Sequence, residues 1–226
     1  STLKEYENYN KIQETIDDIA LEMMRKYNKE KAIVYNTAQM YRWDRIAYLK
    51  ELMAISGKEN FFIGMKLVRG AYIEKERERA EKMGYKDPMQ TTQENTDNDY
   101  NDGIKFCIEN INKIAFCCAS HNEKSKLLLV DLMKQHNISL TDERVYFAQL
   151  LGMSDHISNN MGKAGYNVAK YVPYGPVKDV TPYLIRRDSV NLEALFRNQE
   201  NVKFVNEAMY AVSNEIMGTA FKTSYE

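Results

Sequence analysis

Five short apolar runs, separated by segments with helical spacing, constrain the fold of this chain more than any other feature. The apolar runs cover residues 32–39, 61–72, 114–122, 145–152 and 167–175. Helical patterns occupy residues 42–54, 74–83, 99–111, 123–136 and 154–163. Strand-length apolar runs that alternate with helices predict a parallel sheet covered by helices. An apolar stripe ahead of the first run predicts one more helix, and it consists of Ile12, Ile16, Ile19, Ala20, Met23 and Tyr27.

Polar and aromatic residues follow each apolar run, at the points where the predicted strands end. In a β/α barrel, ligands bind at the carboxyl ends of the strands. The residues at those ends are Gln39, Arg69 to Tyr72, Ser120, His121, Gln149 and Tyr171. We therefore expect these side chains to lie near one another at one end of the sheet.

The segment YVPYGPVKDVTPYLIRR, residues 171–187, closes the series with a strand end, a turn and a helix start. Arg186 and Arg187 stand three and four residues after Tyr183, so one phenol and two guanidinium groups share a helix face. A carboxylate matches the guanidinium fork in a bidentate way. This face predicts a site for a small anion, and a solvated arginine pair is the alternative interpretation.

Several motifs in this order carry a specific resemblance. KLVRGAY, ASHN, YVPYGP and YLIRR resemble the flavin-dependent proline dehydrogenases, and the similarity runs from Gln13 to Arg187. The resemblance implies an α/β fold of the distorted (βα)8 TIM-barrel type, with residues 1–191 as the barrel portion. It also implies non-covalently bound FAD, oxidation of L-proline to 1-pyrroline-5-carboxylate by hydride transfer, and a quinone as electron acceptor. The motifs of this family do not extend into residues 192–226, whose apolar spacing predicts a helical tail.

The resemblance also assigns roles to single residues. Lys66 matches the basic residue beside the flavin N5 and is the expected catalytic group. The implied substrate-binding residues are Leu67, Ala71, Tyr72, Tyr171, Tyr183, Arg186 and Arg187. The implied cofactor-binding residues are Gln39, Lys66, Arg69, Gly70, Ala71, Ser120 and His121.

The chain departs from the family pattern in two places. A barrel has eight strands, whereas the matches here cover the last five, and the first three strands have no counterpart in the sequence. A lysine and an aspartate that those strands supply in the family are not found in residues 1–10, and Val190 takes the place of an acid. An incomplete sheet would leave an unpaired strand edge at residues 32–39, so we expect either a homo-oligomer or further residues that complete the barrel.

The amino-acid composition limits which binding partners and which cellular compartment are expected. The formal net charge of −1 gives no reason to expect nucleic acid, and the three histidines have no metal-ligand spacing. Three cysteines without CxxC spacing fit a reducing compartment. We expect an intracellular protein, which is cytoplasmic or peripherally membrane-bound in a bacterium and mitochondrial in a eukaryote. The run DNDYNDG at residues 97–103 lacks the glycine and the acid of a calcium loop, and we expect a helix cap there.

Two other functions are compatible with the sequence. One is a flavin-free barrel enzyme that uses Arg186 and Arg187 for a different carboxylate or phosphate. The other is a truncated or remodelled barrel that acts as a binding or interaction module without dehydrogenase activity. Bound flavin would distinguish both from a proline dehydrogenase.

Overall fold

The computed structural model describes residues 2–70, 73–176 and 181. The chain divides into two compact units, Ser1–Val172 and Pro173–Glu226, and the fold given below is that of the first unit. The domain boundary predicted between residues 191 and 192 lies outside the described residues.

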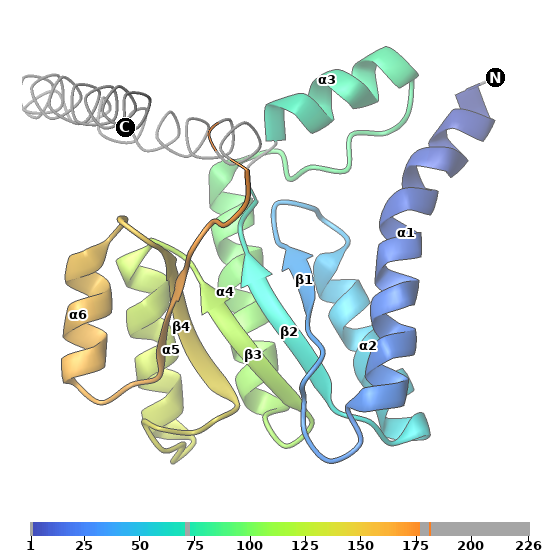
Figure 1. Cartoon of the computed structure of the whole chain (residues 1–226). Coiled ribbons are helices and arrows are strands. Elements are labelled where there is room, and N and C mark those ends of the chain that lie inside the picture. Colours follow the sequence, from blue (N-terminus) through green and yellow to red (C-terminus); the bar gives the residue numbers. More distant parts are fainter. Residues whose placement is uncertain (1, 71–72, 177–180, 182–226) are drawn as a thin grey trace, which may run out of the picture. The chain divides into compact units, whose positions relative to one another are not determined.

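The first unit is built on a parallel sheet with helices in the connections between its strands (Figure 1). The strands are β1 (Asn36–Gln39), β2 (Ile63–Val68), β3 (Ile114–Ala119), β4 (Val145–Leu150) and β5 (Val168–Tyr171). The helices are α1 (Thr2–Tyr27), α2 (Arg45–Glu59), α3 (Ile73–Met83), α4 (Gln93–Glu109), α5 (Glu123–Gln135) and α6 (Asp155–Lys163). The strands pair in chain order and all pairs are parallel, which confirms the predicted α/β alternation.

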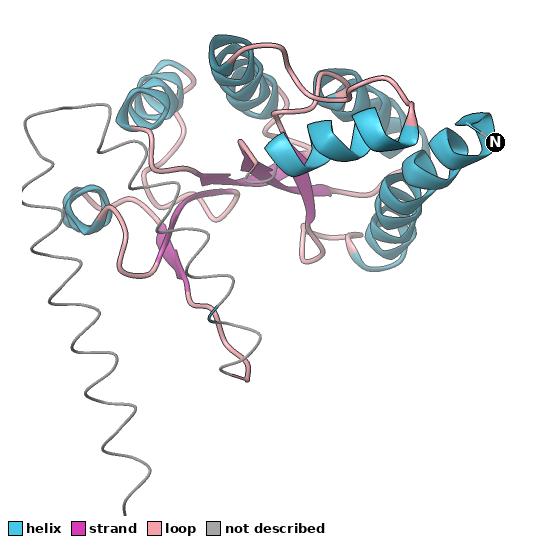
Figure 2. Ribbon diagram, turned by 90° about the horizontal axis from the view of Figure 1, so that it is seen from above, coloured by secondary structure: helices cyan, strands magenta, loops and turns pink. Residues whose placement is uncertain are grey.

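Each strand presents one face to the helices and one face away from them. Figures 1 and 2 show α2, α4 and α5 packed against the same side of the sheet. In β2, Ile63, Met65 and Leu67 are buried in the core cluster. Because side chains alternate along a strand, Lys66 and Val68 point to the opposite side. We call this opposite side the inner face, since it would line the interior of a closed barrel.

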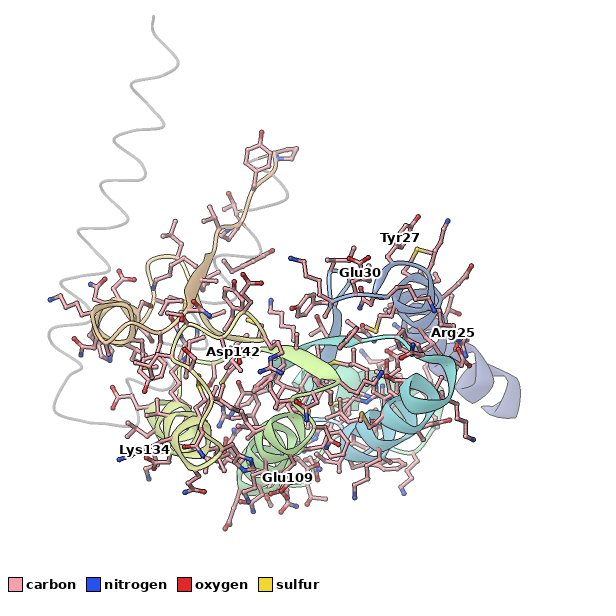
Figure 3. The ribbon with its side chains drawn as sticks, turned by 90° about the horizontal axis from the view of Figure 1, so that it is seen from below. Arg25, Tyr27, Glu30, Glu109, Lys134 and Asp142 are labelled. Carbon is pink, nitrogen blue, oxygen red and sulfur yellow. The ribbon has the colours of Figure 1, made fainter. Side chains whose placement is uncertain are left out.

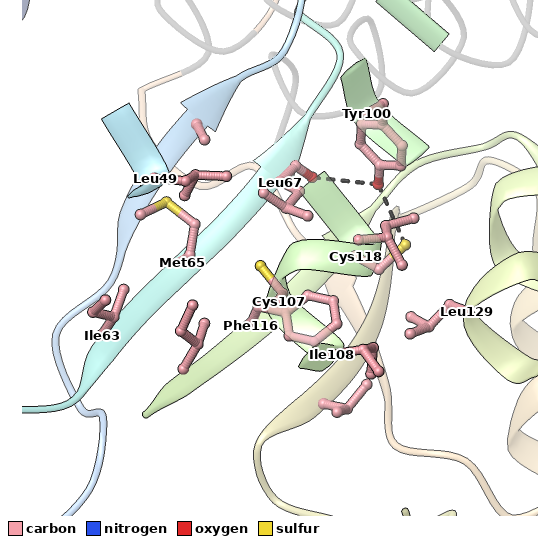
Figure 4. Close-up of a cluster of buried hydrophobic side chains, with 14 of the residues drawn as sticks. Leu49, Ile63, Met65, Leu67, Tyr100, Cys107, Ile108, Phe116, Cys118 and Leu129 are labelled. Carbon is pink, nitrogen blue, oxygen red and sulfur yellow. Dashed lines mark hydrogen bonds between the residues drawn. The ribbon is translucent and has the colours of Figure 1, made fainter. Parts of the chain in front are cut away.

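The core lies between the sheet and the helices (Figure 4). Leu49 of α2, Phe116 of β3 and Leu129 of α5 are fully or almost fully buried there. The hydroxyl of Tyr100 in α4 lies 3.5 Å from the carbonyl oxygen of Leu67 and 3.3 Å from Cys118 Sγ. This buried phenol therefore ties α4 to both β2 and β3 through polar contacts as well as packing.

The other end of the sheet, where strands begin, carries ordinary surface contacts (Figure 3). Glu109 and Lys134 lie near the ends of α4 and α5, and Asp142 lies just before β4. Asp142 accepts a hydrogen bond of 2.6 Å from Arg144, which lowers the pKa of its carboxyl group. Half-exposed pairs of this kind contribute about 0–1 kcal/mol, so this end is held mainly by the core.

β1 is shorter than the predicted run because a side chain replaces a strand neighbour. The run was predicted over residues 32–39, whereas β1 begins at Asn36. Asn28 Oδ1 accepts from the backbone N–H groups of Ile33 and Val34, at 3.0 and 2.8 Å. Asn28 Nδ2 donates to the carbonyl oxygens of Val34 and Phe62, both at 2.9 Å. The backbone ahead of β1 is thus satisfied by Asn28 and not by a ladder.

Two helices also differ from the sequence pattern. α4 starts at Gln93, because Thr92 caps it by accepting from Asn95 N at 3.1 Å, so the expected cap at residues 97–103 lies inside the helix. In α1, Met24 is fully buried, while Ile16, Ile19 and Tyr27 of the predicted stripe are about half exposed. The helix was predicted correctly, but the described part of its apolar stripe does not form its buried face.

Replacing Asn28 with alanine tests its place in the fold. Asn28→Ala removes four hydrogen bonds from a fully buried position and leaves backbone groups unsatisfied. We expect a loss of about 2–4 kcal/mol in the free energy of unfolding, measured by urea denaturation. The exposed Asn159→Ala on α6 is the control and should change it by less than about 0.5 kcal/mol. If the two changes lowered the free energy of unfolding equally, the hydrogen bonds of Asn28 would not stabilise the fold.

Candidate functional site

The inner face of the sheet collects the candidate site residues at its carboxyl end, which the arrowheads of Figure 1 mark. Gln39 at the end of β1 is paired in register with Val68 of β2. Ala119, Ala148 and Ala169 follow in register on β3, β4 and β5. A row of small side chains therefore crosses three adjacent strands, and we call these three residues the alanine row. Longer side chains rise on either side of it.

Lys66 is the charged group on this face. It lies between Thr37 and Cys117 in the strand register, and its Nζ is 5.0 Å from the centre of the Tyr171 ring. The structure thus brings together two predicted site residues that are 105 positions apart in the sequence. Burial raises the pKa of the Cys117 thiol to about 11, and the nearby Lys66 charge only partly opposes this. Cys117 is therefore a neutral thiol at pH 7 and not a nucleophile.

Arg69, which follows β2, is fully engaged by the protein itself. Its Nε donates to Asp97 at 2.5 Å, and its two terminal nitrogens donate to Ser120 Oγ at 2.6 Å and to Ser125 Oγ at 2.8 Å. Its guanidinium carbon lies 4.2 Å from the centre of the Tyr100 ring. The side chain braces the end of β2 against α4 and α5, so a cofactor contact at this position would come from the backbone.

Gly70 has a conformational reason to be glycine. Its φ is +119°, a value that other residues rarely adopt. A Cβ atom here would lie 1.2 Å from Cδ1 of the buried Tyr41 ring. The resemblance assigned Gly70 to the cofactor site, and the structure adds an aromatic ring that already occupies the space of a side chain.

Ser120 and His121 form the loop from β3 to α5. Ser120 Oγ accepts from Arg69 and from the backbone N–H of Asn122. His121 Nδ1 lies 3.0 Å from Ser154 Oγ, which connects this loop to the start of α6. Asn122 caps α5 by accepting from Ser125 N at 3.0 Å. The loop is therefore held at the carboxyl end of the sheet, next to the alanine row.

Not every predicted site residue joins this group. The Leu67 side chain is fully buried in the core on the helix side of the sheet, so the structure does not bring it to the inner face. Ala71, Tyr72, Tyr183, Arg186 and Arg187 lie outside the described residues. Their assignments stay predictions.

Two buried polar residues lie near the site: Gln149, which belongs to the predicted strand-end groups, and Lys126, for which the sequence predicted no role. Gln149 Oε1 accepts from Ser158 Oγ at 2.6 Å, while Gln149 Nε2 and Lys126 Nζ have no hydrogen-bond partner in the described part of the chain. Lys126 is 2% exposed, and burial lowers the pKa of its ammonium group. A signal existed, because Lys126 stands three and seven residues before the buried Leu129 and Met133 on one helical stripe.

Comparison with known proteins fits this arrangement. The family model for proline dehydrogenase matches residues 7–206. The chain belongs to the proline dehydrogenase family. "Proline dehydrogenase 1, mitochondrial" of Drosophila melanogaster is 43% identical over 189 residues, covering 79% of this chain and 28% of the fly protein. The Homo sapiens protein of the same name is 43% identical over 178 residues, covering 77% of this chain and 30% of the human protein.

The fold agrees with solved structures of larger proteins. Proline utilization A from Bdellovibrio bacteriovorus, inactivated by N-propargylglycine, matches with a TM-score of 0.70 and 27% identity. The match covers 75% of this chain and 18% of that protein. The fold is of the TIM-barrel type, and the predicted family and fold class are confirmed. The chain spans less than a third of the length of its fly and human relatives.

Two other site types lack their required features in the described part of the chain. They include no group of three His, Cys, Asp or Glu side chains arranged to hold a metal ion. None of their helices combines the length and the apolar character needed to cross a bilayer.

Lys126 predicts a dependence of stability on pH. Its pKa is lowered in the folded chain from the ordinary 10.5, so the unfolded chain holds this proton more tightly. The contribution of Lys126 to the stability therefore rises as the pH increases through the lowered pKa toward 10.5, and the lysine is most unfavourable below that window. Lys126→Met should raise the free energy of unfolding at pH 7 by about 1–3 kcal/mol and remove this slope. Chemical denaturation from pH 7 to 10.5 measures both, and a destabilised Met variant would contradict the prediction.

Gly70→Ala tests the steric reason for the glycine. The added methyl group must displace the Tyr41 ring and adopt an unfavourable φ, so we expect a loss of about 1–3 kcal/mol in thermal unfolding experiments. Gly57→Ala is the matched control, because Gly57 lies inside α2 with no atom within 4 Å of the added carbon. That change should stabilise the protein by about 0.5–1 kcal/mol. A Gly70→Ala protein as stable as the control would show that the Tyr41 ring moves aside easily.

Proposed function

We propose that this chain supplies the cofactor-binding part of a proline dehydrogenase. The whole protein would oxidise L-proline to 1-pyrroline-5-carboxylate by hydride transfer to FAD and pass the electrons to a quinone. The observation that carries the proposal is the position of Lys66, a cation on the inner face at the carboxyl end of a parallel sheet whose sequence belongs to this family.

The residues present are compatible with FAD. The alanine row gives a flat apolar surface on which a planar ring can lie, and Lys66 and Gln39 place hydrogen-bond donors beside it. The braced loop with Ser120 and His121 adds polar groups at the same end. Residues Lys66, Gln39, Ser120 and His121, with the backbone at Arg69 and Gly70, would hold the cofactor.

The chemistry divides between cofactor and protein. When bound, FAD supplies the hydride acceptor. The C–H bond next to the proline nitrogen breaks with its electron pair, the nitrogen lone pair forms the C=N bond, and the remaining N–H proton passes to water. Lys66 would place positive charge near the bound cofactor, where negative charge develops, and would thereby favour the transition state over the ground state. Tyr171 would border the substrate ring, and Arg186 and Arg187 are predicted to bind the carboxylate.

Partners and compartment follow from the same proposal. The fly and human relatives carry the word mitochondrial in their names. We propose a mitochondrial protein if the source is a eukaryote, and a cytoplasmic or peripherally membrane-associated protein if it is a bacterium. The outer edge of β1 has no strand neighbour among the described residues, which supports either a homo-oligomer or completion of the barrel by further residues.

A binding module without dehydrogenase activity is the second candidate. It is favoured by the five-stranded sheet of the described residues, since five strands do not close a barrel of eight. A chain of this kind would fold and remain monodisperse, yet it would neither turn yellow with FAD nor respond to proline.

Lys66→Met tests the proposed role. The change keeps an unbranched side chain but removes its charge, and a hydrogen bond to a charged group contributes about 1.5–3 kcal/mol. We expect proline-dependent dye reduction with added FAD to fall about ten- to a hundredfold. Lys134→Met, at the opposite end of the sheet (Figure 3), is the control and should leave the rate unchanged. Absence of both FAD binding and turnover in the wild-type chain would favour the binding module.

A further inference from the structure

The contact between Lys66 and Tyr171 spans the inner face. Lys66 is on β2 and Tyr171 is on β5, so β3 and β4 lie between them. In a flat sheet, three strand spacings and a shift of four residues along the strands would separate their backbones by about 20 Å. The ammonium nitrogen nevertheless lies 5.0 Å from the ring centre. The two side chains must therefore extend toward each other over the concave face.

Small residues make this approach possible. Lys66 of β2 pairs in register with Cys117 of β3. Two residues beyond Cys117 on β3 is Ala119, which pairs with Ala148 of β4. Two residues beyond Ala148 on β4 is Leu150, which pairs in register with Tyr171 of β5. The diagonal from Lys66 to Tyr171 thus crosses the alanine row, whose small side chains leave room for the two longer ones.

No charged partner fixes the ammonium group of Lys66 among the described residues, so the contact with the Tyr171 ring is the feature that orients it. Among the described residues, no carboxylate forms an ion pair with Lys66, whereas Arg69 and Lys170 are paired with Asp97 and Asp155. A lysine side chain is flexible, and holding it in one direction costs conformational entropy. An aromatic face within about 6 Å attracts the cation and offsets part of that cost.

We infer that Tyr171 is a positioning residue for Lys66, whose ammonium group its ring face holds on the inner face of the sheet. This role differs from that of an apolar wall of a substrate pocket, because a wall needs only an apolar side chain whereas positioning needs an aromatic face. Its consequence for FAD rests on the proposed function, while the contact itself can be measured without a cofactor.

The first arm of the test measures the contact by NMR in the full chain. The Lys66 ε-methylene signal, identified by its loss in Lys66→Met, should be shifted upfield by the ring. Tyr171→Phe should keep the shift and Tyr171→Leu should abolish it. Tyr146→Leu, which removes another partly exposed aromatic ring from the same face, is the matched control and should keep it. An unchanged Lys66 signal in Tyr171→Leu would overturn the inference.

The second arm measures FAD affinity in a double-mutant cycle. A cation–π contact at a partly exposed site contributes about 0.5–1 kcal/mol, so Tyr171→Leu should weaken FAD binding about two- to fivefold. The same change in a Lys66→Met background should have no effect, and Tyr171→Phe should retain wild-type affinity. If Tyr171→Leu weakened FAD binding equally in both backgrounds, Tyr171 would act as an apolar wall that is independent of Lys66. A wild-type chain that binds no FAD would refute the proposed function alone, since the NMR arm still decides the positioning role.

Discussion

The alternation of side chains along β2 is the constraint on which the candidate site depends. Met65 and Leu67 are fully buried among the helices, and Lys66 stands between them on the opposite face. A shift of one residue in register would drive the ammonium into the core and expose both apolar side chains. Burying each of these side chains contributes about 1.5–3 kcal/mol. The hydrophobic core therefore determines where the charge of the site lies.

Arg69 holds the carboxyl ends of β2 and β3 in place. Its hydrogen bonds reach Asp97 in α4, Ser120 after β3 and Ser125 in α5, so one guanidinium group joins three segments. The motif KLVRGAY identified the position as functional but did not reveal whether the side chain faces a ligand or the protein. The contact partners lie 28 to 56 residues away in the sequence, and no local pattern encodes such a distance.

The sequence predicted the elements well and the polar details poorly, for a physical reason. Strand and helix alternation follows from short-range periodicity, and all five strands form within the predicted runs. The start of β1 depends on Asn28, whose side chain bonds to Val34 and Phe62, and this pairing requires the tertiary fold. The half-exposed Ile16 and Ile19 show the same limit, because periodicity identifies an apolar stripe but not what packs on it. Residue-level roles at the site came from the family motifs, and geometry supports the grouping of Lys66 with Tyr171 while placing Leu67 elsewhere.

Two lysines on opposite faces of the sheet influence the same thiol, since both Lys66 and Lys126 act to lower the pKa of Cys117 against its burial. Arg69 and Lys170 lie close enough to Lys126 to oppose its charge, but each is paired with a carboxylate. Within the described residues, the charges of Lys66 and Lys126 have no such pairing. The carboxyl end of β2 to β5 therefore holds two lysines without a carboxylate partner in the described part of the chain. The unpaired ammonium group of Lys66 on the inner face can bind an anion, which supports a site for a cofactor with phosphate groups and a substrate with a carboxylate.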